Sequence, residues 1–148
     1  MGKRKDKAIH GKKPDFLKTT KQVSPESYLK NRPAWAFSRY DEEHKWGLDF
    51  KNLWWSEILP KLKSYESQTW ADIVAAPKGR GEGSKSHFIT IDKLIKEAQD
   101  RLLYLKIYED ELFSLRLSGV GRLWGIINNG IFYILWYDSN HEICPSNK

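Results

Sequence analysis

The chain has 148 residues, with 25 Lys and Arg against 19 Asp and Glu, a formal net charge of +6, and one cysteine. This length suits a single domain with one core, and seven Trp, seven Tyr and six Phe supply large side chains for it. One cysteine excludes an internal disulfide framework and fits a reducing compartment. No apolar run reaches the ~20 residues that span a membrane, and the basic N-terminus lacks the apolar stretch of a signal peptide. We therefore expect a cytoplasmic protein.

The positive charge is concentrated at the N-terminus. Residues 1–32 hold ten Lys and Arg and three Asp and Glu, whereas residues 33–148 hold 15 and 16 and are nearly neutral. A lysine-rich segment with few apolar residues cannot bury enough surface to order itself. We therefore expect 1–32 to be a flexible, disordered basic leader and 33–148 to be one domain. Lys3, Arg4 and Lys5 are candidate contacts to RNA phosphates, with a solubilising tail as the alternative.

A strand and two helices are predicted in the first half of the domain. The strand lies within 33–40, where the aromatic content rises. A helix follows, with apolar residues at helical spacing, and Pro60 should kink or end it near Leu59. Its apolar positions are Phe50, Leu53, Trp54, Ile58 and Leu62. The second helix runs from Thr69 to Ala75. Among the tryptophans, Trp46 stands between polar neighbours and is expected to be the most exposed.

Residues 76–86 are rich in glycine and read as a flexible connector. Arg80 and Lys85 on this connector are candidate contacts to RNA phosphates, and His87 just after it is a candidate acid or base. An amphipathic helix is predicted over 91–104, with Thr90 as its N-cap.

The C-terminal third predicts antiparallel strands. Phe113, Leu115 and Leu117 alternate with polar residues, which is typical of a strand with one wet face. Asn129-Gly130 is a strong hairpin signal and joins strands over 122–128 and 131–137. The second of these strands is apolar on both faces, so we expect it to be central. A short edge strand is expected over 141–144.

These strands carry the main chemical candidates. If they pair in order, Arg116 and Arg122 flank one short turn, where two guanidiniums can clamp a phosphate and stabilise charge that develops on it. His141 and Tyr137 are candidate acid–base groups for RNA cleavage without a metal. The structural alternative is that the arginines form surface ion pairs and that His141 caps a turn.

Two other motifs are incomplete. The glycine-rich stretch 79–86 lacks the adjacent Gly-Lys of a phosphate-binding P-loop. Asp138, His141 and Cys144 have the spacing of metal ligands but no paired Cys-x-x-Cys or His-x-x-x-His element. We therefore predict neither a metal nor a cofactor.

The stretch 112–144 resembles the RelE/HigB-like toxins of bacterial toxin–antitoxin systems. The resemblance is carried by Leu115-Arg-Leu-Ser-Gly119, Arg122-Leu-Trp-Gly125 and Phe132-Tyr-Ile-Leu-Trp136. It implies cleavage of mRNA without metal, on the ribosome, and neutralisation by an antitoxin protein. Arg116 and Arg122 match the basic strand residues of the family, and Tyr137 or His141 matches its C-terminal acid–base position.

The sequence thus predicts an α+β fold, in which an antiparallel sheet of four or five strands is packed by about three helices. The leading function is a toxin-like endoribonuclease acting on mRNA. The alternatives are a non-catalytic RNA- or ribosome-binding module, in which the leader supplies the affinity, and a protein-interaction domain.

Overall fold

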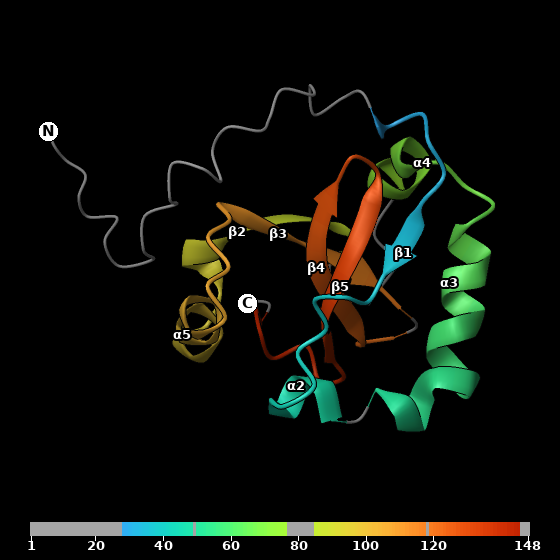
Figure 1. Ribbon diagram of the computed structural model, residues 1–148. Coiled ribbons are helices and arrows are strands. Elements are labelled where there is room, and N and C mark those ends of the chain that lie inside the picture. The colour runs from blue at the N-terminus through green and yellow to red at the C-terminus, as the bar shows by residue number, and fades with distance from the viewer. Residues whose placement is uncertain (1–27, 49, 77–84, 118, 146–148) are drawn as a thin grey trace, which may run out of the picture.

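A computed structural model describes residues 28–48, 50–76, 85–117 and 119–145 of the chain. In this part, five strands form one sheet with the spatial order β1-β5-β4-β3-β2 (Figure 1). The strands are β1 (Ala34–Ala36), β2 (His87–Thr90), β3 (Glu111–Arg116), β4 (Arg122–Asn128) and β5 (Ile131–Asp138). The α-helices are α2 (Lys45–Leu48), α3 (Leu59–Tyr65), α4 (Trp70–Ala75) and α5 (Lys96–Tyr104). The other helical turns are η3 (Lys51–Leu53), η4 (Trp54–Ile58) and η5 (Ile91–Lys93). The predicted α+β class is confirmed.

The sheet is mixed, so the prediction of a purely antiparallel sheet is wrong. β1 runs parallel to β5, with Ala34 opposite Ile131, whereas β2, β3, β4 and β5 pair antiparallel in chain order. The direction of β1 is set by the long connection that separates it from β5. No local pattern in a three-residue strand encodes that direction.

The predicted hairpin between β4 and β5 is confirmed. Asn129 and Gly130 both have positive φ, 56° and 84°, as the turn that matches the twist of the two strands requires. β5 is central, as predicted, since it lies between β1 and β4.

Each face of the sheet carries its own core. The first cluster includes Ile58, Leu62 and Trp70 from the helical segments around α3 and α4, with Phe132 and Ile134 of β5. The second cluster lies on the side of α5, and its buried members are Trp46, Ile91, Leu94, Ala98, Leu102, Leu112, Trp124, Ile126, Leu135, Trp136 and Ile143. β5 therefore contributes to both cores.

A bulge in β5 places two consecutive residues in the second cluster. Trp124 pairs with Trp136 and Gly125 with Ile134, so Leu135 is the extra residue. Its carbonyl accepts a hydrogen bond from the Asp41 N–H at 3.1 Å. A Cβ at Gly125 would collide with the carbonyl oxygen of Tyr133, which explains the glycine.

The predicted helix around Pro60 consists of two different helical segments. η4 is a wide turn in which the Leu59 N–H donates to the Trp54 carbonyl, and α3 begins at Leu59. The wide turn thus gives way to an α-helix between Ile58 and Leu59, at the place where a break was predicted because Pro60 has no N–H to donate. The predicted helix from Thr69 is confirmed as α4, and Thr69 and Asp72 form a reciprocal capping box at its start.

The single helix predicted over 91–104 is wrong at its start. Residues 91–93 form the separate turn η5, and α5 begins only at Lys96. Leu94 and Ile95 are extended, and the Ile95 N–H donates to the Ile143 carbonyl at 2.9 Å. Pairing with the C-terminal segment thus takes residue 95 out of the helix.

Residues 1–27 of the predicted leader lie outside the described residues. Its last residues belong to the packed body, because Tyr28 and Leu29 pack against the first cluster. The Trp70 N–H also donates to the Asn31 carbonyl at 2.9 Å.

Candidate functional site

Four strand ends meet at one end of the sheet. β2 begins at His87, β3 ends at Arg116, β4 begins at Arg122 and β5 ends at Asp138. His87 pairs with Ser114, Arg116 with Arg122, and Arg122 with Asp138. The antiparallel register therefore brings His87, Arg116, Arg122 and Tyr137, all predicted from the sequence, to the same end of the sheet, with Tyr137 on the face of the first cluster and the other three on the opposite face. We call this group, with its neighbours Tyr65 and Ser86, the strand-end site.

Arg116 and Arg122 lie directly opposite each other on neighbouring strands. On its other side Arg122 lies opposite Asp138 of β5, so a carboxylate accompanies the two guanidiniums. Arg122 is completely buried, and its Nη1 donates to the carbonyls of Gly119 and Gly121 at 3.0 and 2.9 Å. Arg122 thus braces the turn between β3 and β4. Arg116 is only half-buried, so it is the guanidinium with access to solvent.

Two hydroxyl groups fix the backbone of Arg116. The Tyr65 hydroxyl donates to the Arg116 carbonyl at 2.6 Å, and the Arg116 N–H donates to Ser86 Oγ at 2.8 Å. Burial raises the pKa of Tyr65, although its bond to Ser86 and the charges of Arg116 and Arg122 oppose this effect. The hydroxyl therefore stays protonated at neutral pH and remains a donor.

Sequence reasoning missed both Tyr65 and Ser86. Tyr65 extends the apolar stripe of Ile58 and Leu62 by one more helical step, and it is buried as that stripe predicts. This spacing is the one signal that pointed to its position. Ser86 lies in a segment that was assigned to a flexible connector, where a buried serine was not expected.

His87 has a defined tautomer in its neutral form. Its Nδ1 lies 2.7 Å from the Lys85 carbonyl, and a carbonyl can only accept. Nδ1 therefore carries the hydrogen, and Nε2 carries the lone pair that a general base needs. Lys85, which was predicted to contact phosphate, is half-buried and lies two residues before the start of β2. Arg80, Lys3, Arg4 and Lys5 lie outside the described residues.

Tyr137 is buried beside the braced turn. A Cβ at Gly121 would lie 3.6 Å from the Tyr137 hydroxyl, which places this hydroxyl at the start of β4. A small residue at Gly121 therefore keeps the hydroxyl close to the turn that Arg122 holds.

His141 lies in a turn just after β5, and the prediction of an edge strand over 141–144 is wrong. Both oxygens of Asp138 accept backbone N–H groups, from Glu142 and Ile143 at 2.9 Å each, and this folds the chain back toward α5. His141 has a φ of 56°, and its two ring nitrogens are buried without a hydrogen-bond partner among the described residues. Among the described residues, no hydrogen bond joins the His141 ring to the strand-end site.

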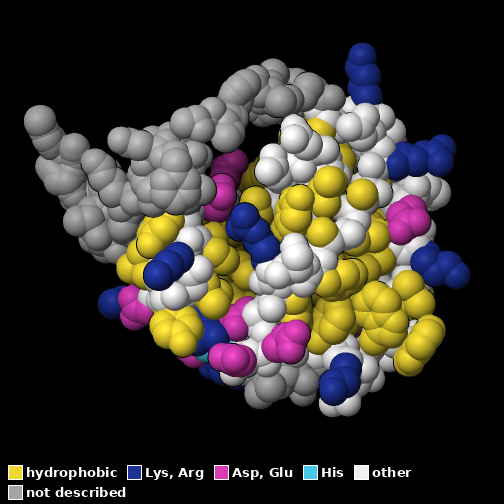
Figure 2. Space-filling model, viewed as in Figure 1, with side chains coloured by type: hydrophobic (Ala, Val, Ile, Leu, Met, Phe, Trp, Pro, Cys, Tyr) yellow, Lys and Arg dark blue, Asp and Glu magenta, His cyan; other side chains and the backbone are white. Residues whose placement is uncertain are grey.

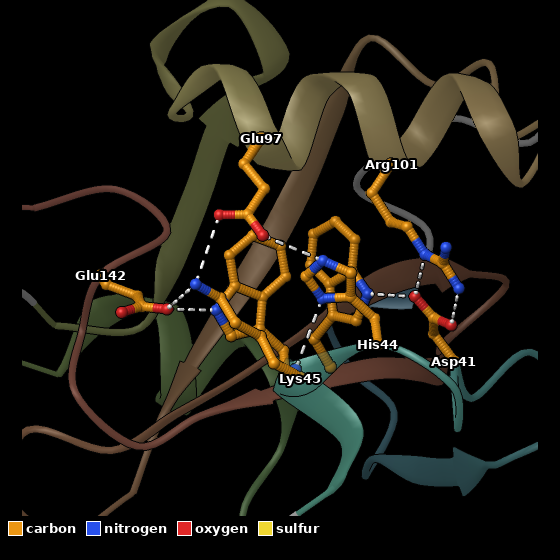
Figure 3. A network of polar contacts seen from close by, with 8 residues as sticks. Asp41, His44, Lys45, Glu97, Arg101 and Glu142 are labelled. Carbon is orange, nitrogen blue, oxygen red and sulfur yellow. Dashed lines mark hydrogen bonds and ion pairs between the residues drawn. The ribbon is translucent and has the colours of Figure 1, made fainter.

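A second polar group lies on the side of α5, and we call it the α5 network (Figure 3). Arg101 donates from Nε and Nη2 to both oxygens of Asp41, at 2.9 and 2.8 Å, and Trp136 Nε1 donates to Asp41 at 2.9 Å. Burial raises the pKa of Asp41, but these bonds and the charge of Arg101 outweigh it, so the pKa lies below its usual value. Asp41 is only 5 % exposed, and this pair ties the chain after β1 to α5.

The rest of the α5 network alternates in charge. His44 Nε2 lies 3.1 Å from Glu97, and Lys45 Nζ lies 3.3 Å from both Glu97 and Glu142. Trp46 is 4 % exposed and donates to Glu142 at 2.6 Å, so its predicted exposure is wrong. This indole bond is the main cause that lowers the pKa of Glu142. The network joins residues 41–46, α5 and the C-terminal turn.

None of the helices in the described residues has the length and apolarity to cross a bilayer. No three His, Cys, Asp or Glu side chains in the same residues are grouped as metal ligands. In the comparisons with known proteins, no family model, no curated protein and no solved structure matches this chain.

Proposed function

We propose that the chain is a toxin-like endoribonuclease that cleaves mRNA in the cytoplasm without a metal, in association with the ribosome. The observation that carries the proposal is the pairing of Arg116 with Arg122 at one end of the sheet, with His87 near them on the same face of the neighbouring strand. The resemblance of 112–144 to RelE/HigB-like toxins points to the same chemistry, and an antitoxin is the partner it implies.

The residues of the strand-end site fit the steps of RNA cleavage by its own 2′-hydroxyl. A base removes the proton from the 2′-hydroxyl, and the resulting oxygen attacks the adjacent phosphorus. The bond from phosphorus to the 5′-oxygen breaks, an acid protonates that oxygen, and a 2′,3′-cyclic phosphate remains. The negative charge on the phosphorus oxygens rises in the transition state, so a fixed cation beside them accelerates the reaction.

Each group has a role in this scheme. Arg116, with access to solvent, contacts the phosphate oxygens. His87, with its lone pair on Nε2, is the base. The Tyr137 hydroxyl, at the same end of the sheet but on the face of the first cluster, is the acid. Arg122 acts as a positioning residue through the turn that it braces. His141 holds its place in the scheme as an alternative acid, reached if the turn after Asp138 opens.

The charge of the leader favours a second candidate function, a non-catalytic RNA- or ribosome-binding module. Ten Lys and Arg against three Asp and Glu in residues 1–32 are suited to sequence-independent contact with phosphates. Removal of residues 1–27 should then abolish most RNA affinity and flatten its dependence on salt. An unchanged affinity would exclude this role for the leader.

Induced expression in bacteria separates the two functions. The wild-type chain should arrest growth, and Arg116→Ala should restore it, because the cation at the phosphate is lost. Lys96→Ala is the matched control, since it also removes an exposed-surface cation, one paired only with Asp100 in its own helix. Normal growth with soluble wild-type protein would contradict the endoribonuclease.

A further inference from the structure

An aromatic surface on the other side of the first cluster is exposed to solvent. It consists of Phe37, Trp54 and Trp55, supported from below by Phe50. Trp55 is 76 % exposed and Phe37 is 42 % exposed. The ring of Phe37 contacts the rings of Phe50 and Trp54, with centres 5.9 and 6.0 Å apart. Figure 2 shows hydrophobic side chains gathered on this side of the molecule, with charged side chains of both signs at their margin.

The wide turn η4 explains why Trp55 points outward. Trp54 packs against the first cluster and Ile58 is completely buried, so these two residues face the core. Trp55, next in the chain, then projects on the opposite side. Pro60 cannot donate a regular helical bond, which favours the wide turn at this place. An exposed indole contributes little to the free energy of folding, so folding alone does not explain it.

Cations accompany the aromatic surface toward the strand-end site. Lys51, one turn before Trp54, is exposed. Lys61 follows in α3, and its Nζ lies 5.1 Å from the ring centre of Tyr65. Tyr65 in turn bonds to Arg116. From Trp55 to Tyr65 the helical segment rises about 15 Å, the length of a few nucleotides. Lys51, Trp55 and Lys61 thus lie along one helical segment, whose last residue, Tyr65, holds the backbone of Arg116.

We propose that the aromatic surface binds single-stranded RNA, with a base stacked on Trp55 and the flanking phosphates on Lys51 and Lys61. The proposal rests on the proposed function, because it assigns a second contact to the same RNA. Every base has a face that can stack on an indole, so this contact needs no particular RNA sequence. The positive charge along η3 and α3 selects a polyanion over an uncharged apolar partner. Residues 51–65 contain three basic residues, Lys51, Lys61 and Lys63, and one acidic residue, Glu57.

The test is the affinity of the full chain for a single-stranded RNA of about 12 nucleotides with 2′-O-methyl groups, which cannot be cleaved. Trp55→Ala should weaken binding about tenfold, and Trp55→Phe should retain most of the affinity because a ring remains. Tyr104→Ala is the matched control, since Tyr104 is 69 % exposed on α5, away from the aromatic surface. Lys51→Ala should lower the slope of log affinity against log salt by about 0.7.

An abasic strand with the same number of phosphates separates stacking from charge. If bases stack on Trp55, Trp55→Ala should leave the affinity for this strand unchanged. The proposal is overturned if Trp55→Ala binds normal RNA as the wild type does, or weakens both strands equally. If Trp55→Ala binds normal RNA as the wild type does, the aromatic surface would instead be assigned to binding a protein partner.

Cleavage of the unmodified RNA, measured in parallel, separates this proposal from the proposed function. Binding that depends on Trp55 without any cleavage would support the aromatic surface and contradict the endoribonuclease. Cleavage without any dependence of binding on Trp55 would do the opposite.

Discussion

The strand-end site and the α5 network are both polar, but they differ in how charge is arranged. In the α5 network, acids and bases alternate, and Asp41, Glu97 and Glu142 each have a cation within 3.3 Å. At the strand-end site, two guanidiniums stand opposite each other on β3 and β4, and Asp138 of β5 lies opposite the second of them. Alternating charges lower the energy of the fold, whereas like charges side by side raise it.

The difference assigns different roles to the two regions. The α5 network joins segments that are far apart in the sequence, so its loss should reduce stability. The strand-end site holds two guanidiniums and one carboxylate, that of Asp138, on three adjacent strands, and this excess of positive charge suits contact with an anion. Substitutions in the first region should therefore change the free energy of unfolding, and those in the second should change activity.

The largest effect on stability is expected for Asp41→Ala. It leaves Arg101 without its bidentate partner and the Trp136 indole N–H without an acceptor. The free energy of unfolding should fall by about 2–3 kcal/mol, at the lower end for a buried pair because Arg101 is partly reached by water. Urea unfolding measures this change, and Lys96→Ala, which breaks an exposed pair, should cost less than about 0.5 kcal/mol. Equal losses of unfolding free energy in the two variants would contradict a structural role of the network.

A smaller loss of stability, with a larger loss of activity, is expected for Tyr65→Phe. The variant keeps the buried ring but loses the bond to the Arg116 carbonyl. Unfolding should become easier by about 1 kcal/mol, while RNA cleavage should slow more than tenfold because Arg116 is no longer held. Ser67→Ala is the control, since it deletes an exposed hydroxyl bonded within the same helix end. Full activity in Tyr65→Phe would separate Tyr65 from the strand-end site.

The smallest effect concerns acid pH. The pKa values of Asp41 and Glu142 are lower in the folded chain than their usual values. Their contribution to stability is complete above the unfolded pKa, near 4, and is lost as the pH falls through the folded pKa. Unfolding midpoints measured from pH 7 to about pH 3 should therefore fall at the acid end, and Asp41→Asn should fall less steeply. An identical slope in both proteins would mean that Asp41 does not carry this linkage.

Local signals predicted the local structure well. Asn129-Gly130 placed the hairpin, and Pro60 placed the change of helix type. The alternation in β3 predicted one wet face, and this is wrong, because Ser114 on that face is 1 % exposed and both faces of β3 are covered. Arg116 and Arg122 could be brought together from the sequence because a short turn between antiparallel strands fixes their register.

Contacts between distant segments could not be predicted in this way. The Asp41–Arg101 pair spans 60 residues, and Trp46 is buried because Glu142 and Trp136 cover it from the C-terminal end of the chain. The same reason explains the direction of β1. Ser86 belongs to the site because β2 pairs with β3. The strand β2 was not predicted, because it directly follows a glycine-rich stretch that indicated a flexible connector.

The most direct test of the account is cleavage of a defined mRNA by the purified chain in EDTA. The wild type should release fragments that end in a 2′,3′-cyclic phosphate. Arg116→Ala should cleave at least ~100-fold more slowly with an unchanged urea midpoint. Asp41→Ala, while folded, should keep the wild-type rate. Absence of cleavage by the folded wild type, or an undiminished rate in Arg116→Ala, would contradict the assignment of the strand-end site.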